Sequence, residues 1–161
     1  MAIGQAQYFD DSETIPPPER EKYQNQKLRE TVEYAYHHSR AAKNLLDFAG
    51  IQPSQIQTPE DLSKIPIIRK TDLIEMQKAD PPFGGLLAIP QEEIERIFIS
   101  PGPIYEYQPS GIQWFARSFH AAGFRKGDIV VNTFTYHMSP AGILFHEGLR
   151  QCGATVVVMG T

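Results

Sequence analysis

A strand-like apolar run, Ile94 to Ile99, leads directly into the stretch Ser100-Pro101-Gly102-Pro103. In nucleotide-binding α/β enzymes, the loop that follows such a strand holds phosphate groups with its backbone amides and hydroxyls. Serine and glycine are residue types suited to that task. The position and composition of this stretch therefore predict a phosphate loop.

A second candidate site follows the next strand-like run, Ile129 to Thr133, and covers Thr135 to Gly142. Loops at the carboxyl ends of parallel strands are where such sheets bind ligands. The same residues also suit a simple loop-to-helix junction, with Ser139 as N-cap, Pro140 at the first helical position and the aromatic side chains packing. From the residues alone, both interpretations stay open.

Composition narrows the class of protein. The chain has 161 residues, a net charge of −4 and a single cysteine, Cys152. The charge gives no general attraction to nucleic acid or an anionic membrane, and no apolar run approaches the ~20 residues that span a bilayer. No secretory signal is visible at Met1 to Asp11, and a lone cysteine fits a reducing cytoplasm. The five histidines lack metal-ligand spacing, so we expect no metal site.

The first half of the chain has helical patterns. Residues 1–18 end in three prolines and predict an extended, partly mobile segment, and residues 19–85 predict a helical region. Ser39 is expected to cap the second helix and Gly50 to end it in the left-handed conformation. Thr58-Pro59 is a strong helix start, and a further short helix is expected near Lys70.

After the Pro- and Gly-rich stretch 81–85, strands alternate with helices. The expected strands are 94–99, 129–133 and 154–158, with helical patterns ending at Gly123 and spanning Pro140 to Gln151. Residues 86–161 are thus expected to form a βαβαβ portion of a mainly parallel sheet with crossover helices. The predicted fold class is α/β, and Phe115, Phe119 and Trp114 are expected to be core residues rather than a ligand box.

Several segments in order resemble the N-terminal part of the phenylacetate–CoA ligase family, which belongs to the AMP-forming acyl-CoA ligases. The resemblance covers most of the chain from about residue 20, and its segments are Leu28–Tyr36, Leu62–Leu73, Pro82–Pro90, Glu93–Ile97, Ala122–Asp128 and Gly153–Val157. Such enzymes join a carboxylic acid to ATP, release pyrophosphate, and pass the acyl group to coenzyme A. The resemblance implies ATP, Mg²⁺ and coenzyme A as cofactors and a small carboxylic acid as substrate.

The resemblance also implies roles for residues of both loops. The cofactor-binding candidates are Ser100, Gly102 and Tyr105. In the acyl-binding loop, Tyr136 and Met138 would line an apolar or aromatic slot, His137 could orient the carboxylate, and Gly142 would let a ligand approach the backbone.

The first loop departs from the family pattern of Ser, Gly and Thr residues ending in Gly-Lys. Here two prolines remove amide donors, the lysine is missing, and Glu106 adds negative charge. Loss of one charged phosphate contact costs about 1.5–3 kcal/mol. The loop could bind ATP by other means, form a rigid turn in a protein that has lost adenylation, or serve acyl binding or an unrelated role.

Two functions from different classes follow. The first is the N-terminal portion of an ATP-dependent ligase that joins an aromatic or other organic acid to coenzyme A through an acyl-adenylate. The resemblance implies that further parts, including a mobile domain with a catalytic lysine, complete that enzyme, so residues 1–161 alone are expected to be inactive. The alternative is a noncatalytic binding or assembly module on the same scaffold. An unpaired sheet edge also predicts that the chain associates with itself, as a homo-oligomer, or with a complementary chain.

Overall fold

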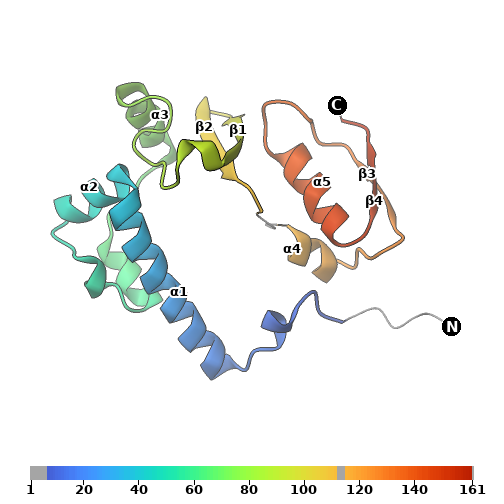
Figure 1. The fold of residues 1–161 in the computed structure, drawn as a ribbon, viewed down its shortest axis with the longest axis horizontal. Helices are drawn as coiled ribbons and strands as arrows, with labels where there is room; N and C mark the ends of the chain where they lie inside the picture. The colour runs from blue at the N-terminus through green and yellow to red at the C-terminus, as the bar shows by residue number, and fades with distance from the viewer. Residues whose placement is uncertain (1–6, 112–114, 161) are drawn as a thin grey trace. The chain divides into compact units, whose positions relative to one another are not determined.

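The computed structural model describes residues 7–111 and 115–160, and Figure 1 shows its helices and strands in chain order. The predicted Trp114 core position and the first six residues of the predicted N-terminal segment lie outside this range. The chain divides into two compact units. We call Pro16–Ile97 with Pro101–Ser110 the helical unit, and Met1–Ile15, Phe98–Ser100 and Gly111–Thr161 the sheet unit.

Two helices dominate the helical unit, α1 (Pro17–His38) and α2 (Arg40–Phe48). Ser39 separates them, and its hydroxyl accepts a hydrogen bond from the Ala42 amide at 3.3 Å. Gly50 has a φ of 67°, a conformation that costs a glycine little. The predicted cap and the predicted helix end are both confirmed.

The core of the helical unit lies where α1, α2 and the following turns meet. Val32, Leu46, Ile51 and Ile56 are buried together there. A 3₁₀ helix, η3 (Pro59–Lys64), follows at the predicted Thr58-Pro59 start. The Asp61 carboxylate accepts the amides of Gln57 and Thr58, at 2.8 and 3.0 Å. α3 (Lys70–Ala79) then forms the predicted short helix.

Strands β1 (Ile94–Ser100) and β2 (Ile104–Pro109) pair in a two-stranded sheet. The turn at 101–103 is too short for a crossover, so the pair is an antiparallel hairpin. β1 was predicted, but β2 was not, because the polar side chains of Tyr105, Glu106 and Gln108 give no apolar strand pattern. At the predicted phosphate loop, the chain makes a tight turn over residues 101–103.

The sheet unit contains 3₁₀ helix η1 (Asp11–Thr14), α4 (Ala116–Ala121), β3 (Ile129–Asn132), α5 (Ala141–Gln151) and β4 (Thr155–Val158). β3 and β4 pair in parallel, with Ile129 opposite Thr155 and Val131 opposite Val157. α5 connects these strands and packs against both (Figure 1). This strand–helix–strand unit, after the helices of the first half, confirms the α/β class.

The helix α5 starts one residue later than the predicted cap implies. Pro140 occupies the N-cap position and no side chain caps the helix, so the prediction of Ser139 as N-cap is wrong.

Aromatic rings pack edge to face around Phe145 of α5. Phe145 meets Phe115, Phe119 and Phe134 with ring centroids 4.8, 5.6 and 4.7 Å apart. Phe115 and Phe119 are therefore packing residues, as predicted.

The described helices include none that is both long enough and apolar enough to cross a lipid bilayer. The longest, α1, carries charged side chains along its length.

Candidate functional site

Asn132 is the last residue of β3 and lies at the carboxyl end of the parallel strand pair. It is buried, and both the nitrogen and the oxygen of its side-chain amide form hydrogen bonds. The amide nitrogen donates to the Tyr136 hydroxyl at 2.7 Å and to the Gly142 carbonyl at 2.9 Å. The amide oxygen accepts from the Phe134 N–H at 3.1 Å. One side chain thus joins the end of β3, the following loop and the first turn of α5.

Tyr136 and His146 form the second layer of this cluster. The Tyr136 hydroxyl lies 3.3 Å from His146 Nδ1, and the rings meet edge to face with centroids 5.9 Å apart. His146 belongs to α5, one turn beyond Gly142. We call Asn132, Tyr136, Gly142 and His146 the loop-anchoring cluster.

Gly142 lets the protein's own backbone approach the start of α5 closely. A Cβ atom at this position would collide with the Thr135 carbonyl and lie 2.7 Å from its carbon. The loop backbone therefore lies directly on the start of α5. A larger residue would displace the loop that carries Tyr136.

The end of β1 lies beside the same loop. The Ile99 N–H donates to the Met138 carbonyl at 2.9 Å, within the sheet unit. Ser100 is the next residue and is buried, yet its hydroxyl has no hydrogen-bond partner in the structure. A buried hydroxyl without a partner is costly unless a ligand or water satisfies it. The Ser100 hydroxyl is thus free to bond a further group, and Ser100 directly follows Ile99, whose N–H contacts the candidate acyl-binding loop.

Gly102 and Tyr105 belong to the helical unit. The Gln77 side chain pairs with the Tyr105 backbone like a neighbouring strand: its Oε1 accepts from the Tyr105 N–H at 2.9 Å, and its Nε2 donates to the carbonyl at 2.7 Å. The Tyr105 amide is therefore occupied, and only the side chain remains for a ligand.

That side chain borders a hollow of about 560 Å³ within the helical unit, which Lys70 and Glu106 also line. Phe83 and Tyr107 supply aromatic walls, with centroids 5.4 Å apart. Lys70 begins α3. A lysine on this hollow offers a positive charge that the predicted loop lacks.

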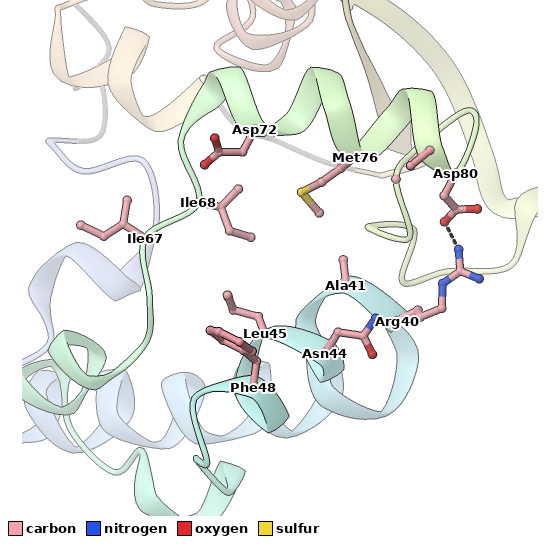
Figure 2. A pocket seen from close by; sticks show the side chains of 12 residues that line it. Arg40, Ala41, Asn44, Leu45, Phe48, Ile67, Ile68, Asp72, Met76 and Asp80 are labelled. Atoms are coloured by element: carbon pink, nitrogen blue, oxygen red, sulfur yellow. Dashed lines mark ion pairs between the residues drawn. The ribbon is translucent and has the colours of Figure 1, made fainter.

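A second hollow of the helical unit, about 710 Å³, lies between α2 and the segment from Ile67 to Gly84 (Figure 2). Its walls are mainly apolar, with Leu45, Phe48, Ile68 and Met76 facing the space. At one end Arg40 forms an ion pair with Asp80. The Asp72 carboxylate also lines the hollow and accepts the Arg69 N–H at 2.8 Å, so the hollow offers mainly apolar surface.

His137 and Met138 project from the loop, and both are exposed. The structure therefore brings Ser100, Tyr136, Met138 and Gly142 into one neighbourhood and leaves His137 on its surface. Sequence reasoning missed Asn132 and His146. Asn132 is a polar residue at the end of an otherwise apolar strand, and His146 is a histidine one helical turn after Gly142. Both patterns are too common in proteins to indicate a site. Across the described residues, no group of three or more His, Cys, Asp or Glu side chains could hold a metal ion.

Solved structures define the class of this fold. A crystal structure of 2-hydroxyisobutyryl-CoA ligase, in the postadenylation state with R3-HIB-AMP, matches the whole chain with a TM-score of 0.90 and 27% identity. Another, with 2-HIB-AMP and CoA in the thioesterification state, matches 92% of the chain with a TM-score of 0.83. These matches cover 35% and 33% of the respective ligase chains. The fold is that of part of an acyl-CoA ligase.

Curated relatives narrow the class to a family. The chain is 34% identical over 159 residues to the phenylacetate-coenzyme A ligase of Thermus thermophilus, and 31% identical over 160 residues to that of Pseudomonas putida. These alignments include 93% and 94% of the chain but 35% of each relative. The enzyme of Escherichia coli K12 is also 31% identical, over 94% of the chain and 36% of its own length. No family model matches. The resemblance to the phenylacetate–CoA ligase family is confirmed, for a chain that spans about a third of its relatives.

Proposed function

We propose that this chain is the N-terminal portion of an ATP-dependent ligase that joins an aromatic or other organic acid to coenzyme A through an acyl-adenylate. The observation that carries the proposal is the match of nearly the whole chain to acyl-CoA ligases, one of them solved with an acyl-adenylate and CoA. The proximity of Ser100 to the loop 135–142 supports it, since both candidate ligand-binding groups then lie at one end of the sheet unit.

Bound ATP would supply the AMP leaving group that makes a carboxylate reactive. The chain's own contribution is to bind and orient the reactants. The Ser100 hydroxyl, which lacks a partner in the protein, would donate to a phosphate oxygen. Tyr136 and Met138 would form the wall of the acid slot, and His137 would reach the acid from the exposed rim of the loop. Mg²⁺ would be bound chiefly by the phosphates, since the described residues form no cluster of metal ligands.

We further propose that residues 1–161 do not complete the reaction alone, because they span about a third of the relatives' length. The proposed substrate is a small carboxylic acid, with no role for nucleic acid or membrane. The buried, unpaired Cys152 supports a reducing, cytoplasmic setting.

A noncatalytic binding or assembly module is the second candidate. Three observations favour it: Pro101 and Pro103 in the turn, Glu106 on the hollow beside Tyr105, and the occupied Tyr105 amide. Each removes a donor or adds a negative charge where a polyphosphate would need the opposite.

The ligase proposal is tested by acid-dependent exchange of pyrophosphate into ATP. The assay uses the complete reading frame that encodes residues 1–161, and in parallel the Thermus thermophilus ligase in which these residues replace the aligned segment. Both are screened with aromatic and aliphatic carboxylic acids. Exchange that requires the acid supports the proposal. A folded protein with neither exchange nor ATP binding would refute it.

Calorimetry with Mg-ATP separates the two candidates. The ligase proposal predicts measurable ATP affinity in the unmodified protein, and an increase in Glu106→Ala if that carboxylate opposes phosphate. The assembly module predicts no ATP binding by either form. The exposed Glu21→Ala on α1 is the matched control for loss of one negative charge.

A further inference from the structure

The Tyr136 hydroxyl has little hydrogen-bonding capacity left for a ligand. A tyrosine hydroxyl can donate once and accept twice. The Asn132 amide nitrogen can only donate, so the hydroxyl oxygen accepts that bond of 2.7 Å. Its single hydrogen is then free to point to His146 Nδ1, 3.3 Å away. This direction requires the His146 ring to accept at Nδ1 and to carry its hydrogen on Nε2.

Asn132 is a rigid support for this arrangement. Its side chain is 4% exposed and uses both amide hydrogens, one for Tyr136 and one for the Gly142 carbonyl. Its backbone carbonyl accepts the amides of Met159 and Gly160, both at 3.2 Å, where β4 ends. The amide cannot rotate without breaking bonds to the loop and to α5.

We propose that Asn132 and His146 are positioning residues for Tyr136, which therefore presents its ring to the acid slot and withholds its hydroxyl from the acid. A carboxylate only accepts hydrogen bonds, and in the proposed arrangement the single hydrogen of the Tyr136 hydroxyl is donated to His146 Nδ1, 3.3 Å away. The slot wall is thus aromatic and apolar, which favours acids with a hydrophobic body. The carboxylate end is bound by other groups. The use of the slot rests on the proposed ligase function, whereas the hydrogen-bond chain does not.

The hydrogen-bond chain is tested on residues 1–161 by nuclear magnetic resonance. Long-range proton–nitrogen correlations of ¹⁵N-histidine protein report the tautomer of each neutral ring, and the His146 signal is assigned by its loss in His146→Asn. We expect His146 with its proton on Nε2 in the unmodified protein, and a mixture of tautomers in Tyr136→Phe. A proton on Nδ1, or the same tautomer in both proteins, would overturn the proposal.

A double-mutant cycle separates positioning from general packing. Tyr136→Phe and His146→Leu each remove one side of the bond, so their shifts in the urea midpoint should be strongly non-additive. His146→Asn should restore most of the loss, because its Oδ1 lies near the position of Nδ1 and can accept from the hydroxyl. Additive shifts, or no rescue by Asn, would contradict the proposal.

The third arm measures acid use in an active ligase that carries these residues. Asn132→Asp and His146→Leu should raise KM for the acid by about tenfold, leaving KM for ATP within about twofold, the pattern of a displaced slot wall. If the hydroxyl instead bound the carboxylate, Tyr136→Phe would weaken acid binding equally in the unmodified and His146→Leu backgrounds. Absence of any ligase activity would refute the proposed function but leave the tautomer and midpoint results decisive for the positioning role.

Discussion

The pairing of Gln77 with β2 gives a sharp test of how the predicted phosphate loop is built. Gln77 is 7% exposed and bonds both backbone groups of Tyr105. We consider Gln77→Leu, which keeps the bulk of the side chain but removes both polar atoms. The variant leaves the Tyr105 N–H and carbonyl without their protein partners.

The expected loss follows from the two bonds. Each hydrogen bond contributes about 0.5–1.5 kcal/mol net, and a partner left unsatisfied in a buried setting adds about 1–3 kcal/mol. Tyr105 is partly exposed, so water satisfies some of that need, and the leucine gains some apolar burial. We expect Gln77→Leu to destabilise the local structure by about 2–4 kcal/mol.

Hydrogen exchange at the Tyr105 amide measures this local loss of stability directly, whatever the order in which the two units unfold. A loss of about 2–4 kcal/mol corresponds to exchange about 30- to 900-fold faster. Gln26→Leu is the matched control, since Gln26 lies exposed on α1 with a single side-chain bond to Glu30. It should leave the Tyr105 exchange rate unchanged.

Gln77→Glu sharpens the test through pH. A protonated carboxyl can both accept from the Tyr105 N–H and donate to its carbonyl, as Gln does, whereas the carboxylate only accepts. Folding therefore raises the pKa of this introduced group, and its stabilisation is present at low pH and lost as pH rises through the folded value. Gln77→Glu should be more stable than Gln77→Leu near pH 4 and lose that advantage toward pH 7. Unchanged Tyr105 exchange in Gln77→Leu would refute the reasoning.

Three further predictions concern other parts of the chain. The Lys64 ammonium and two backbone amides hold the pKa of Asp61 well below its usual range, so the stabilisation from this carboxylate is present at neutral pH and lost as pH falls below about 4. Asp61→Asn should therefore lower the urea midpoint at pH 7, and the gap between the midpoints of the two proteins should close in acid. Val131 and Val157 lie exposed on one face of the β3–β4 pair, so the isolated chain should self-associate. Val131→Lys should reduce the self-association seen in sedimentation velocity, and a strictly monomeric unmodified chain at high concentration would contradict the prediction. Burial raises the pKa of the Cys152 thiol, which also donates a hydrogen bond to the Ala116 carbonyl. Maleimide should therefore label Cys152 slowly in native buffer and fast in urea. Rapid labelling in native buffer would count against the packed α4–α5 contact.

Local signals predicted most elements of the fold. Ser39 and Gly50 act through their own backbone and nearest neighbours, so their roles as cap and helix end were readable from single residues. The β-branched run of β4 likewise predicted a strand of a parallel pair, which the register with β3 confirms. Such features depend on a few adjacent residues, and no distant partner is needed to fix them.

The features that sequence could not supply depend on partners distant in the chain. β2 is stabilised by the Gln77 side chain, 28 residues away from Tyr105, and by pairing with β1. Its polar composition gives no strand signal without those partners. His146 likewise gains its role only because α5 carries it back to Tyr136, ten residues earlier. The predicted binding roles of all seven candidates stay predictions: Ser100, Gly102, Tyr105, Tyr136, His137, Met138 and Gly142.

The contrast between Ser100 and Tyr105 bears on which function the chain performs. A rigid turn that had lost every role in ligand binding would have little reason to keep a buried hydroxyl without a partner, because such a group costs stability. Ser100 is buried and unsatisfied, whereas the Tyr105 amide is fully bonded to Gln77. We therefore expect the first half of the predicted loop to bind a polar ligand, whereas the Tyr105 backbone in its second half is already bonded to Gln77. Ser100→Ala tests this: it should raise stability slightly in the ligand-free chain and weaken Mg-ATP binding in the complete protein. Stability lost on removing that hydroxyl would mean that it already has a partner, and the ligase proposal would lose its best-placed phosphate donor.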